Sequence, residues 1–387
     1  MSELIGTQEG VWGDVVGQAE AVAQLQKAAI DPQALTHAWL IVGPPGSGRS
    51  TAAKAFAATL ECETKTGCGT CDQCQMVLNG THPDVKLLET EAITYKVADV
   101  KELVAQSVAK PTVGRYQIIL MEDADRMRSD SANSLLKAIE EPGPSTIWLL
   151  CAPTAQDVIP TIRSRCREVR LHTPSVAAVA ELLEREGVDK ETAISAAQAA
   201  QSHIGMARWL ANDPGAMQRR LATFDMLSAM RSVPAAAIQA AALVESAKTE
   251  ASAATDILNE KEQNELKAVL GIGKDEAIPP KLRAQFKDLE EDQKRRARRQ
   301  ERDVLQRTCT DLLTLFRDVL ALQFQAEVQA TNGISPQARE LTQRLAARTT
   351  PAETLKRVDA IMTAQERLAA NVPPLLAMEA MLLELRW

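Results

Sequence analysis

The chain has 387 residues, of which 45% are hydrophobic, 25% charged and only 3% aromatic, and its formal net charge is −7. This length exceeds what one hydrophobic core usually serves, so two or three domains are expected. The acidic balance excludes a protein held to nucleic acid mainly by its overall charge. No run approaches the roughly 20 apolar residues of a membrane span, and residues 1–18 lack a basic start and an apolar core, so we expect a cytoplasmic protein.

The N-terminal part alternates short apolar runs with helix-like segments. Residues 38–42, 117–121 and 147–151 are apolar runs bounded by polar or turn residues, as expected of buried strands. Residues 97–109 and 131–140 have the spacing of helices. Strands that alternate with helices predict an α/β domain built on a parallel sheet.

After residue 173 the strand signal fades and amphipathic helices replace it. Three helices are predicted in the following stretch, at 176–186, 191–202 and 217–232. We therefore predict three domains, which are an α/β domain at 1–173, a small helical domain at 174–235 and a C-terminal helical domain at 236–387.

A charged segment near residues 248–303 interrupts the C-terminal domain. Residues 281–303 alone hold nine basic and six acidic side chains. The mixture of signs favours a solvated helix or a mobile insertion. The alternative is a basic strip, from Lys294 to Arg302, that contacts DNA phosphates. Residues 304–387 then regain the apolar periodicity of a helical bundle.

A glycine-rich loop at residues 43–50 follows the first apolar run. It has the spacing of a phosphate-binding loop and leads into an Ala-rich, helix-like segment. In such a loop the glycines let backbone N–H groups approach a phosphate, and the start of the next helix favours negative charge. The residues predicted to contact a nucleotide are Gly43, Gly46, Gly48, Arg49, Ser50 and Thr51.

Two departures from the usual ATPase pattern argue against efficient hydrolysis. Arg49 stands where the loop motif requires Lys, and the two side chains are not interchangeable. Glu122 and Asp123 follow the strand at 117–121 and reverse the usual order of Asp for the metal and Glu for the attacking water. A displacement of about 1 Å can cost roughly 100-fold in rate. The chain is therefore expected to lack efficient ATPase activity of its own, while binding of ATP or ADP stays open.

Four of the seven cysteines lie close together in the sequence. Cys62, Cys68, Cys71 and Cys74 have the spacing C-x5-C-x2-C-x2-C, and thiolates in such turns can surround a tetrahedral metal. Structural zinc is the prediction, with free thiols or an iron–sulfur cluster as alternatives. With four thiolates the metal has no open position, which argues against catalytic zinc.

Arginines also lie beyond the strand at 147–151. Arg163 and Arg165 belong to the segment Thr-Ile-Arg-Ser-Arg-Cys at 161–166. A guanidinium at this place can bind a phosphate held by a neighbouring subunit, or form a surface salt bridge.

Further segments complete a family pattern, namely Asp14-Val15-Val16-Gly17-Gln18, His37-Ala38-Trp39, Asn133-Ser134-Leu135-Leu136-Lys137-Ala138-Ile139-Glu140-Glu141-Pro142, Ser164-Arg165-Cys166 and Gly205-Met206-Ala207-Arg208. Their order resembles the clamp-loader branch of the AAA+ superfamily, which serves bacterial DNA polymerase III in replication. The resemblance covers about residues 10–235. It implies an AAA+ phosphate-loop domain with an inserted zinc module near 62–74, a helical lid at 174–235 and a helical collar at 236–387.

The resemblance also implies roles for single residues. Arg165 is similar to the arginine finger that enters the ATP site of an adjacent subunit, and Arg208 is similar to the second sensor of the nucleotide site. Residues 151–154, Cys-Ala-Pro-Thr, depart from the hydroxyl sensor of the family's ATPase subunits. The pattern is similar to that of the family's non-hydrolysing subunit.

The implied assembly is a spiral of five subunits. Its members would be the gamma and tau ATPase subunits, the delta subunit and this chain, and the spiral would open the beta sliding clamp on primer-template DNA. Two other readings are an active gamma- or tau-like ATPase subunit, which needs Arg49, Glu122 and Asp123 to support turnover, and a zinc-bearing DNA-binding regulator, which leaves the phosphate loop unexplained.

Overall fold

The computed structural model describes residues 10–88, 95, 97–127, 129–213, 215–230, 232–270, 272–273, 276, 278–326 and 336–386. Residues 1–9 of the opening segment and Trp387 therefore lie outside the described residues. The chain divides into two compact units, Met1–Pro214 and Gly215–Trp387. The finer division into three domains at residues 173 and 235 stays a prediction.

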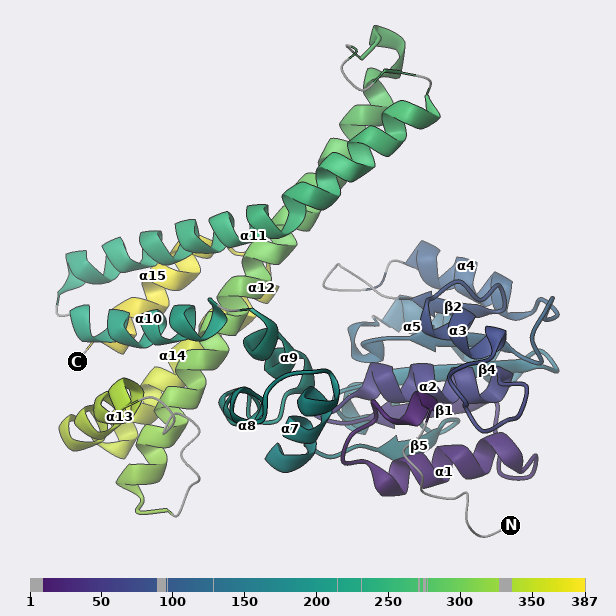
Figure 1. Ribbon diagram of the computed structural model, residues 1–387, viewed down its shortest axis with the longest axis horizontal. Coiled ribbons are helices and arrows are strands. Elements are labelled where there is room, and N and C mark those ends of the chain that lie inside the picture. Colours follow the sequence, from purple (N-terminus) through teal and green to yellow (C-terminus); the bar gives the residue numbers. More distant parts are fainter. Residues whose placement is uncertain are drawn as a thin grey trace. The chain divides into compact units, whose positions relative to one another are not determined.

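The first unit is built on a parallel sheet (Figure 1). Within the described residues five strands run in the order β2-β3-β4-β1-β5, and every neighbouring pair is parallel. The strands are β1 (Ala38–Val42), β2 (Val85–Leu88), β3 (Gln117–Met121), β4 (Thr146–Ala152) and β5 (Arg167–Arg170). The predicted α/β class and its parallel sheet are confirmed.

The three central strands are the three that the sequence identified. β1 and β3 have the predicted bounds, and β4 is one residue longer at each end. Every residue of these strands is buried. Strands covered on both faces read as continuous apolar runs, which explains why they stand out in the sequence.

Helices cover both faces of the sheet and create two cores (Figure 1). Successive residues of β1 alternate between them, since Trp39 and Ile41 face the first core and Leu40 and Val42 face the second. The helices of this α/β part are α1 (Ala19–Ile30), α2 (Arg49–Glu61), α3 (Asp72–Leu78), α4 (Val97–Ser107), α5 (Ser129–Glu140) and α6 (Pro160–Arg163), with short 3-10 helices η1 (Gly10–Trp12), η2 (Ala124–Arg126) and η3 (Ala155–Asp157). The two predicted helices, 97–109 and 131–140, correspond to α4 and α5.

A group of three short helices ends the first unit. They are α7 (Val176–Arg185), α8 (Lys190–Ala199) and α9 (Ile204–Asn212), and α7 and α8 each match a predicted helix within a few residues. Side-chain caps explain where they begin, because Ser175, Asp189 and His203 each accept a hydrogen bond from a backbone N–H in the first turn. The beginning of α9 was not anticipated, since histidine is not among the usual capping residues.

The second unit is helical throughout its described residues. It contains α10 (Ala216–Ala229), α11 (Val233–Val269), η4 (Pro280–Leu282), α12 (Arg283–Gln323), α13 (Pro336–Arg348), α14 (Pro351–Ala369) and α15 (Pro374–Leu385). One core joins these helices and includes Phe224, Phe316 and Leu382. The helical character predicted for residues 304–387 is confirmed for those of them that the structure describes. The charged segment is largely helical, because α11 and α12 run through most of it and lie side by side (Figure 1).

In the described ranges, no helix combines the length and the apolar character required to cross a bilayer.

Candidate functional site

The loop between β1 and α2 has the backbone that phosphate binding requires. Gly46 and Gly48 have φ of 80° and 89°, a region that favours glycine. A Cβ on Gly43 would lie 2.6 Å from the Ser47 hydroxyl oxygen, so this position also admits only glycine without a shift. The loop leads directly into α2, whose 13 residues present their positive N-terminal end to it. Ser50 and Thr51 lie in the first turn of α2.

Arg49 turns toward the acidic residues that follow β3. Its side chain is 14% exposed, and its Nη2 atom lies 3.8 Å from an Asp123 carboxylate oxygen. Asp123 has a left-handed φ of 49° and also pairs with Arg126 at 3.2 Å. The basic residue of the loop and the second acidic residue therefore neutralise each other.

Glu122, the other acidic residue, has a basic partner on α2. The Lys54 Nζ atom lies 3.6 Å from a Glu122 carboxylate oxygen. The predicted acidic pair does lie beside the phosphate loop, but both members are engaged by cations of this chain. That arrangement leaves less negative charge for a magnesium ion.

His203 contacts the loop and was not anticipated from the sequence. A Cβ on Gly46 would lie 2.3 Å from the His203 ring, and the Ile204 N–H donates to the Gly46 carbonyl at 3.3 Å. Burial lowers the pKa of His203, so the ring is neutral at pH 7 and its Nδ1 accepts from the Met206 N–H. The start of α9 therefore closes against the phosphate loop.

A depression of about 620 Å³ lies between the segment before α1 and helix α7. Val16 and Gly17 line one side, and Glu181, Glu184 and Arg185 of α7 line the other. The Gln18 amide donates to the His172 carbonyl at 2.6 Å and to the Ser47 carbonyl at 3.4 Å, linking this side to the phosphate loop. The depression is therefore connected to the phosphate loop through Gln18 and not lined by the loop itself.

Arg208 does not point freely into the nucleotide site. Its guanidinium forms a two-pronged contact with Glu186 at the end of α7, with N–O distances of 2.5 and 2.9 Å. The hydrogen bonds raise the pKa of Arg208 further above its usual value. The structure thus places this residue in an ion pair within the α7–α9 group.

Arg165 lies at the surface, between α6 and β5, where an ion pair and two hydrogen bonds hold it. Its side chain is 38% exposed, with Nη2 2.6 Å from a Glu140 carboxylate oxygen of α5. Nη1 donates to the Thr161 carbonyl at 2.8 Å and to the Ser164 hydroxyl at 3.1 Å. The guanidinium is therefore oriented at the surface yet accessible to another molecule. Glu140 is the last residue of α5 and belongs to the segment 133–142 that was singled out in the sequence.

The four cysteines predicted to bind metal come together as one cluster. Their sulfur atoms all lie within 4.8 Å of one another, with Cys62 Sγ 3.7 Å from Cys68 Sγ and 4.0 Å from Cys71 Sγ. Four sulfurs around zinc at about 2.3 Å stand about 3.8 Å apart, so the spacing fits a tetrahedral ion. The cluster is compatible with the predicted structural zinc.

Local hydrogen bonds favour ionisation of Cys62, one of the four thiols of the cluster. Burial opposes ionisation of Cys62, but hydrogen bonds with Thr64 and Cys68 lower the pKa of its thiol to about 5. The Cys68 and Cys71 N–H groups donate to sulfur at 3.5 and 3.4 Å. A thiolate is the form that binds zinc, so the hydrogen bonds favour the metal-binding form of Cys62, whereas burial raises the pKa of Cys74.

Comparison with known proteins finds relatives for the part of the chain that carries these features. Residues 17–175 match the family model described as DNA polymerase III, delta subunit. The subunit delta' of Pseudomonas aeruginosa is 33% identical over 190 residues, which are 48% of this chain and 54% of that protein. The subunit tau/gamma of Haemophilus influenzae is 32% identical over 228 residues, which are 57% of this chain and 33% of that protein. The chain thus spans about half or less of the length of these relatives.

A solved structure of a DNA polymerase III gamma subunit-related protein from Thermotoga maritima aligns with 94% of this chain and 98% of its own, with 18% identity and a TM-score of 0.42. The family-model match spans the part of the chain that carries the phosphate loop, the cysteine cluster and Arg165. Through these residues the chain is similar to the delta-subunit family of DNA polymerase III and to its delta' and tau/gamma subunits.

Proposed function

We propose that this chain is the delta-prime type of clamp-loader subunit, a stator that hydrolyses no ATP efficiently and supplies Arg165 to the ATP site of a neighbouring subunit. In this role the guanidinium of Arg165 stabilises the negative charge that develops on the transferred γ-phosphate. The chain then contributes to loading the sliding clamp onto primed DNA during replication.

The contrast between two arginines carries this proposal. Arg49, in the chain's own phosphate loop, is nearly buried and pairs with Asp123. Arg165 stays exposed at the surface, where its partner Glu140 is also accessible. In this chain the cation of the phosphate loop is neutralised, while Arg165 at the surface can be reached by another subunit. This combination is what a chain acting on a neighbour's ATP site requires.

The other assigned roles follow from the same proposal. Gly43, Gly46 and Gly48, with the first residues of α2, form a degenerate nucleotide site for ATP or ADP without efficient hydrolysis, and zinc on the four cysteines holds the module between α2 and α3 together. The partners are the gamma and tau ATPase subunits, the delta subunit, the beta clamp and primer-template DNA, in a cytoplasmic complex of five subunits.

An active ATPase subunit is the second candidate. It is favoured by the matches to tau and gamma subunits, which are as strong in identity as the match to delta'. It requires that Arg49 leave Asp123 for the phosphates of ATP and that Glu122 leave Lys54 for magnesium.

ATP turnover by the purified chain separates the two candidates. The proposal expects no turnover by the chain alone, and DNA-stimulated turnover when the chain is mixed with the ATPase subunits, the delta subunit, the clamp and primed DNA. Robust turnover by the chain alone would identify an ATPase subunit instead.

Arg165→Ala tests the arginine finger itself. We expect the five-subunit complex to assemble, while turnover at the neighbouring ATP site falls about 1,000-fold, as is usual for such fingers. Arg170→Ala is the matched control, because Arg170 is 73% exposed nearby on β5 and pairs with Glu168 of the same strand. Unchanged turnover in the Arg165→Ala complex would remove the arginine finger from the proposal.

A further inference from the structure

The charged segment at residues 248–303, which we call the arm, lies outside the core of the second unit. The arm comprises the adjoining ends of α11 and α12, side by side (Figure 1). Among the described residues, the buried apolar core of this unit includes Ala247 and Leu305 but no residue between them. Because the arm adds little to that core, its function must lie in the side chains on its surface.

The two helices of the arm are joined by polar contacts with a fixed register. Gln293 is 6% exposed, and its amide donates to the Asn259 carbonyl at 3.1 Å and to Glu262 at 3.2 Å. Arg296 forks onto both carboxylate oxygens of Glu262, at 2.8 and 3.0 Å. These contacts fix which side of α12 faces α11, and therefore which side faces outward.

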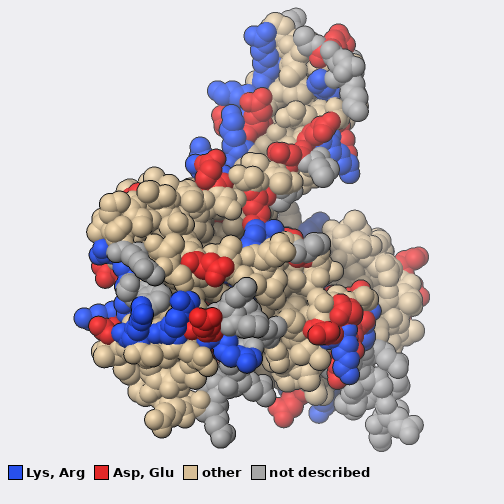
Figure 2. Space-filling model, turned by 60° about the vertical axis from the view of Figure 1, so that its left-hand side comes forward, with Lys and Arg blue, Asp and Glu red and all other residues tan. Residues whose placement is uncertain are grey.

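The outward side of α12 carries more basic than acidic side chains, with the exposed Glu291 among them, three residues before Lys294. We call Lys287, Lys294, Arg295, Arg298 and Arg299 the basic face. Steps of seven and four residues from Lys287 to Lys294 to Arg298 keep these three on one side of the helix, away from Gln293 and Arg296. Figure 2 shows blue side chains along one edge of the arm, with red side chains beside them and both colours on its other edge.

The carboxylate partners of the basic face are weakly engaged. Lys294 and Arg295 pair with Glu290 and Asp292 on their own helix, but their side chains are 68% and 69% exposed. Exposed pairs of this kind contribute little and are screened by salt. A dense row of phosphates can therefore replace them.

We propose that the basic face of α12 binds the phosphate backbone of duplex DNA. It rises about 18 Å along the helix from Lys287 to Arg299, the length of about five base pairs. The inference assigns the arm a contact separate from the ATP site, so it does not depend on the role of Arg165.

The amino-acid composition of the basic face favours duplex DNA over a single strand or a protein partner. A single strand is usually held by bases stacked on aromatic rings, and a protein partner by aromatic or apolar anchors. The only aromatic residue in α12 before Phe316 is Phe286, which is 5% exposed and faces inward. Arginines and lysines without such anchors suit the evenly charged backbone of a duplex.

Binding of a fluorescently labelled duplex of about 25 base pairs to the full chain at about 50 mM salt tests the proposal. The variant Lys294→Gln, Arg295→Gln, Arg298→Gln should bind at least 10-fold more weakly, and the slope of log affinity against log salt should fall by about 3. The matched control removes the same charge from α11 of the same arm, through Lys248→Gln, Lys261→Gln and Lys267→Gln, and should stay within about twofold of the native chain.

Three results would overturn the proposal. They are no duplex binding by the native chain, equal losses in the two triple variants, which would indicate bulk charge alone, and equally tight binding of polyglutamate, which would indicate an acidic protein partner. Arg298→Gln alone guards against misfolding, since this exposed change should leave the circular dichroism and melting unchanged and lower the salt slope by about 1.

Discussion

Asp84 lies at the start of β2 with its carboxylate nearly enclosed, at 2% exposure. Its oxygens accept hydrogen bonds from the backbone N–H groups of Thr112, Val113 and Gly114 and from the Thr112 hydroxyl. Burial alone would raise the pKa of Asp84, but these hydrogen bonds lower it to about 2. One side chain thereby fixes the loop that leads into β3.

Asp84→Asn should lower the free energy of unfolding by about 3 kcal/mol at pH 7, because the amide presents N–H donors to groups that themselves donate. The pKa of Asp84 is lower in the folded chain than its ordinary value of 3.8. Its stabilising effect is therefore complete above pH 4 and is lost as the pH falls toward 2. Urea unfolding across this range should show a steeper loss for the native chain than for the variant.

Asp99→Asn is the control for Asp84→Asn. Asp99 is exposed on α4, so this substitution should change the free energy of unfolding by less than about 0.5 kcal/mol. A native chain and an Asp84→Asn variant that lose stability in parallel below pH 4 would contradict the assignment.

The sequence identified the residues expected to act on a nucleotide or a metal, but not the residues that they contact. Arg49, Glu122 and the cysteines stand in motifs whose spacing follows from the chemistry. The contact of His203 with Gly46 and that of Arg165 with Glu140 join segments distant in the chain. The local spacing of apolar residues cannot predict such contacts. Only the fold brings them together.

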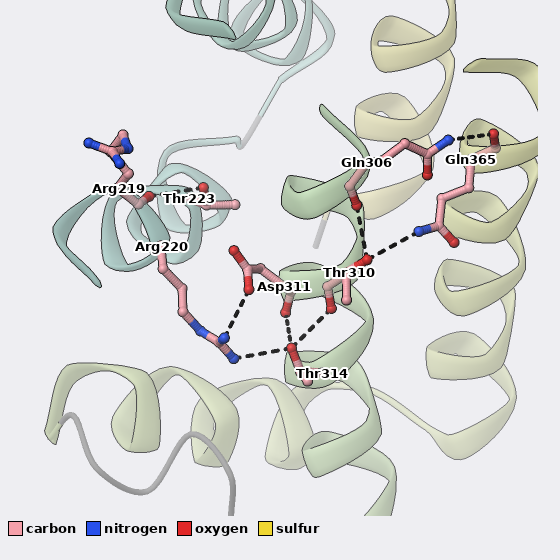
Figure 3. A network of polar contacts seen from close by, with 8 residues as sticks. All are labelled: Arg219, Arg220, Thr223, Gln306, Thr310, Asp311, Thr314 and Gln365. Carbon is pink, nitrogen blue, oxygen red and sulfur yellow. Dashed lines mark hydrogen bonds and ion pairs between the residues drawn. The ribbon is translucent and has the colours of Figure 1, made fainter. Parts of the chain in front are cut away.

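At the scale of elements, α10 and α12 are joined by a buried ion pair (Figure 3). Arg220 and Asp311 are 3% and 6% exposed, with Nη1 2.9 Å from a carboxylate oxygen. Arg220 also donates to the Thr314 hydroxyl at 3.3 Å. Such a pair fixes how the two helices meet, because either charge left alone in this core would be strongly destabilising.

Asp311→Ala should lower the free energy of unfolding by about 3 to 5 kcal/mol, since it leaves the Arg220 guanidinium buried without its carboxylate. Replacing both residues, as Arg220→Met with Asp311→Leu, should recover most of that loss, because an apolar pair avoids the desolvation cost. Urea unfolding of the two variants and the native chain measures both effects. A double variant as unstable as Asp311→Ala would mean that packing, and not the buried charge, sets the cost.

Strands could be predicted where burial produces a continuous run of apolar residues in the sequence. β1 and β3 are buried along their whole length, so their bounds could be read directly. β2 and β5 were missed, because they are edge strands of four residues and β5, Arg-Glu-Val-Arg, buries only Val169. α12 was expected only as a solvated helix or a mobile insertion, since its register against α11 depends on polar contacts such as Arg296 with Glu262.

At the scale of the whole molecule, the two units have separate cores. The cores beside the sheet and the core of the helical unit share no residue. The cysteine cluster belongs to the first unit, where the Val11 N–H donates to the Gly67 carbonyl at 2.9 Å and ties the module to η1. Composition predicted several domains but not this tie, because it joins segments more than 50 residues apart.

Metal removal should therefore act on one unit only. We expect about one zinc ion per chain by mass spectrometry, and a strong chelator or Cys68→Ser should lower the melting temperature of the first unit by about 5 to 10 °C, equivalent to roughly 2 to 3 kcal/mol. Differential scanning calorimetry should resolve two transitions, of which only one responds. Cys309→Ala identifies the other transition, because Cys309 is fully buried in the core of the second unit and far from the cluster in sequence. A chelator that shifted the transition marked by Cys309→Ala, or shifted neither, would show that the cluster does not hold the first unit together through a metal.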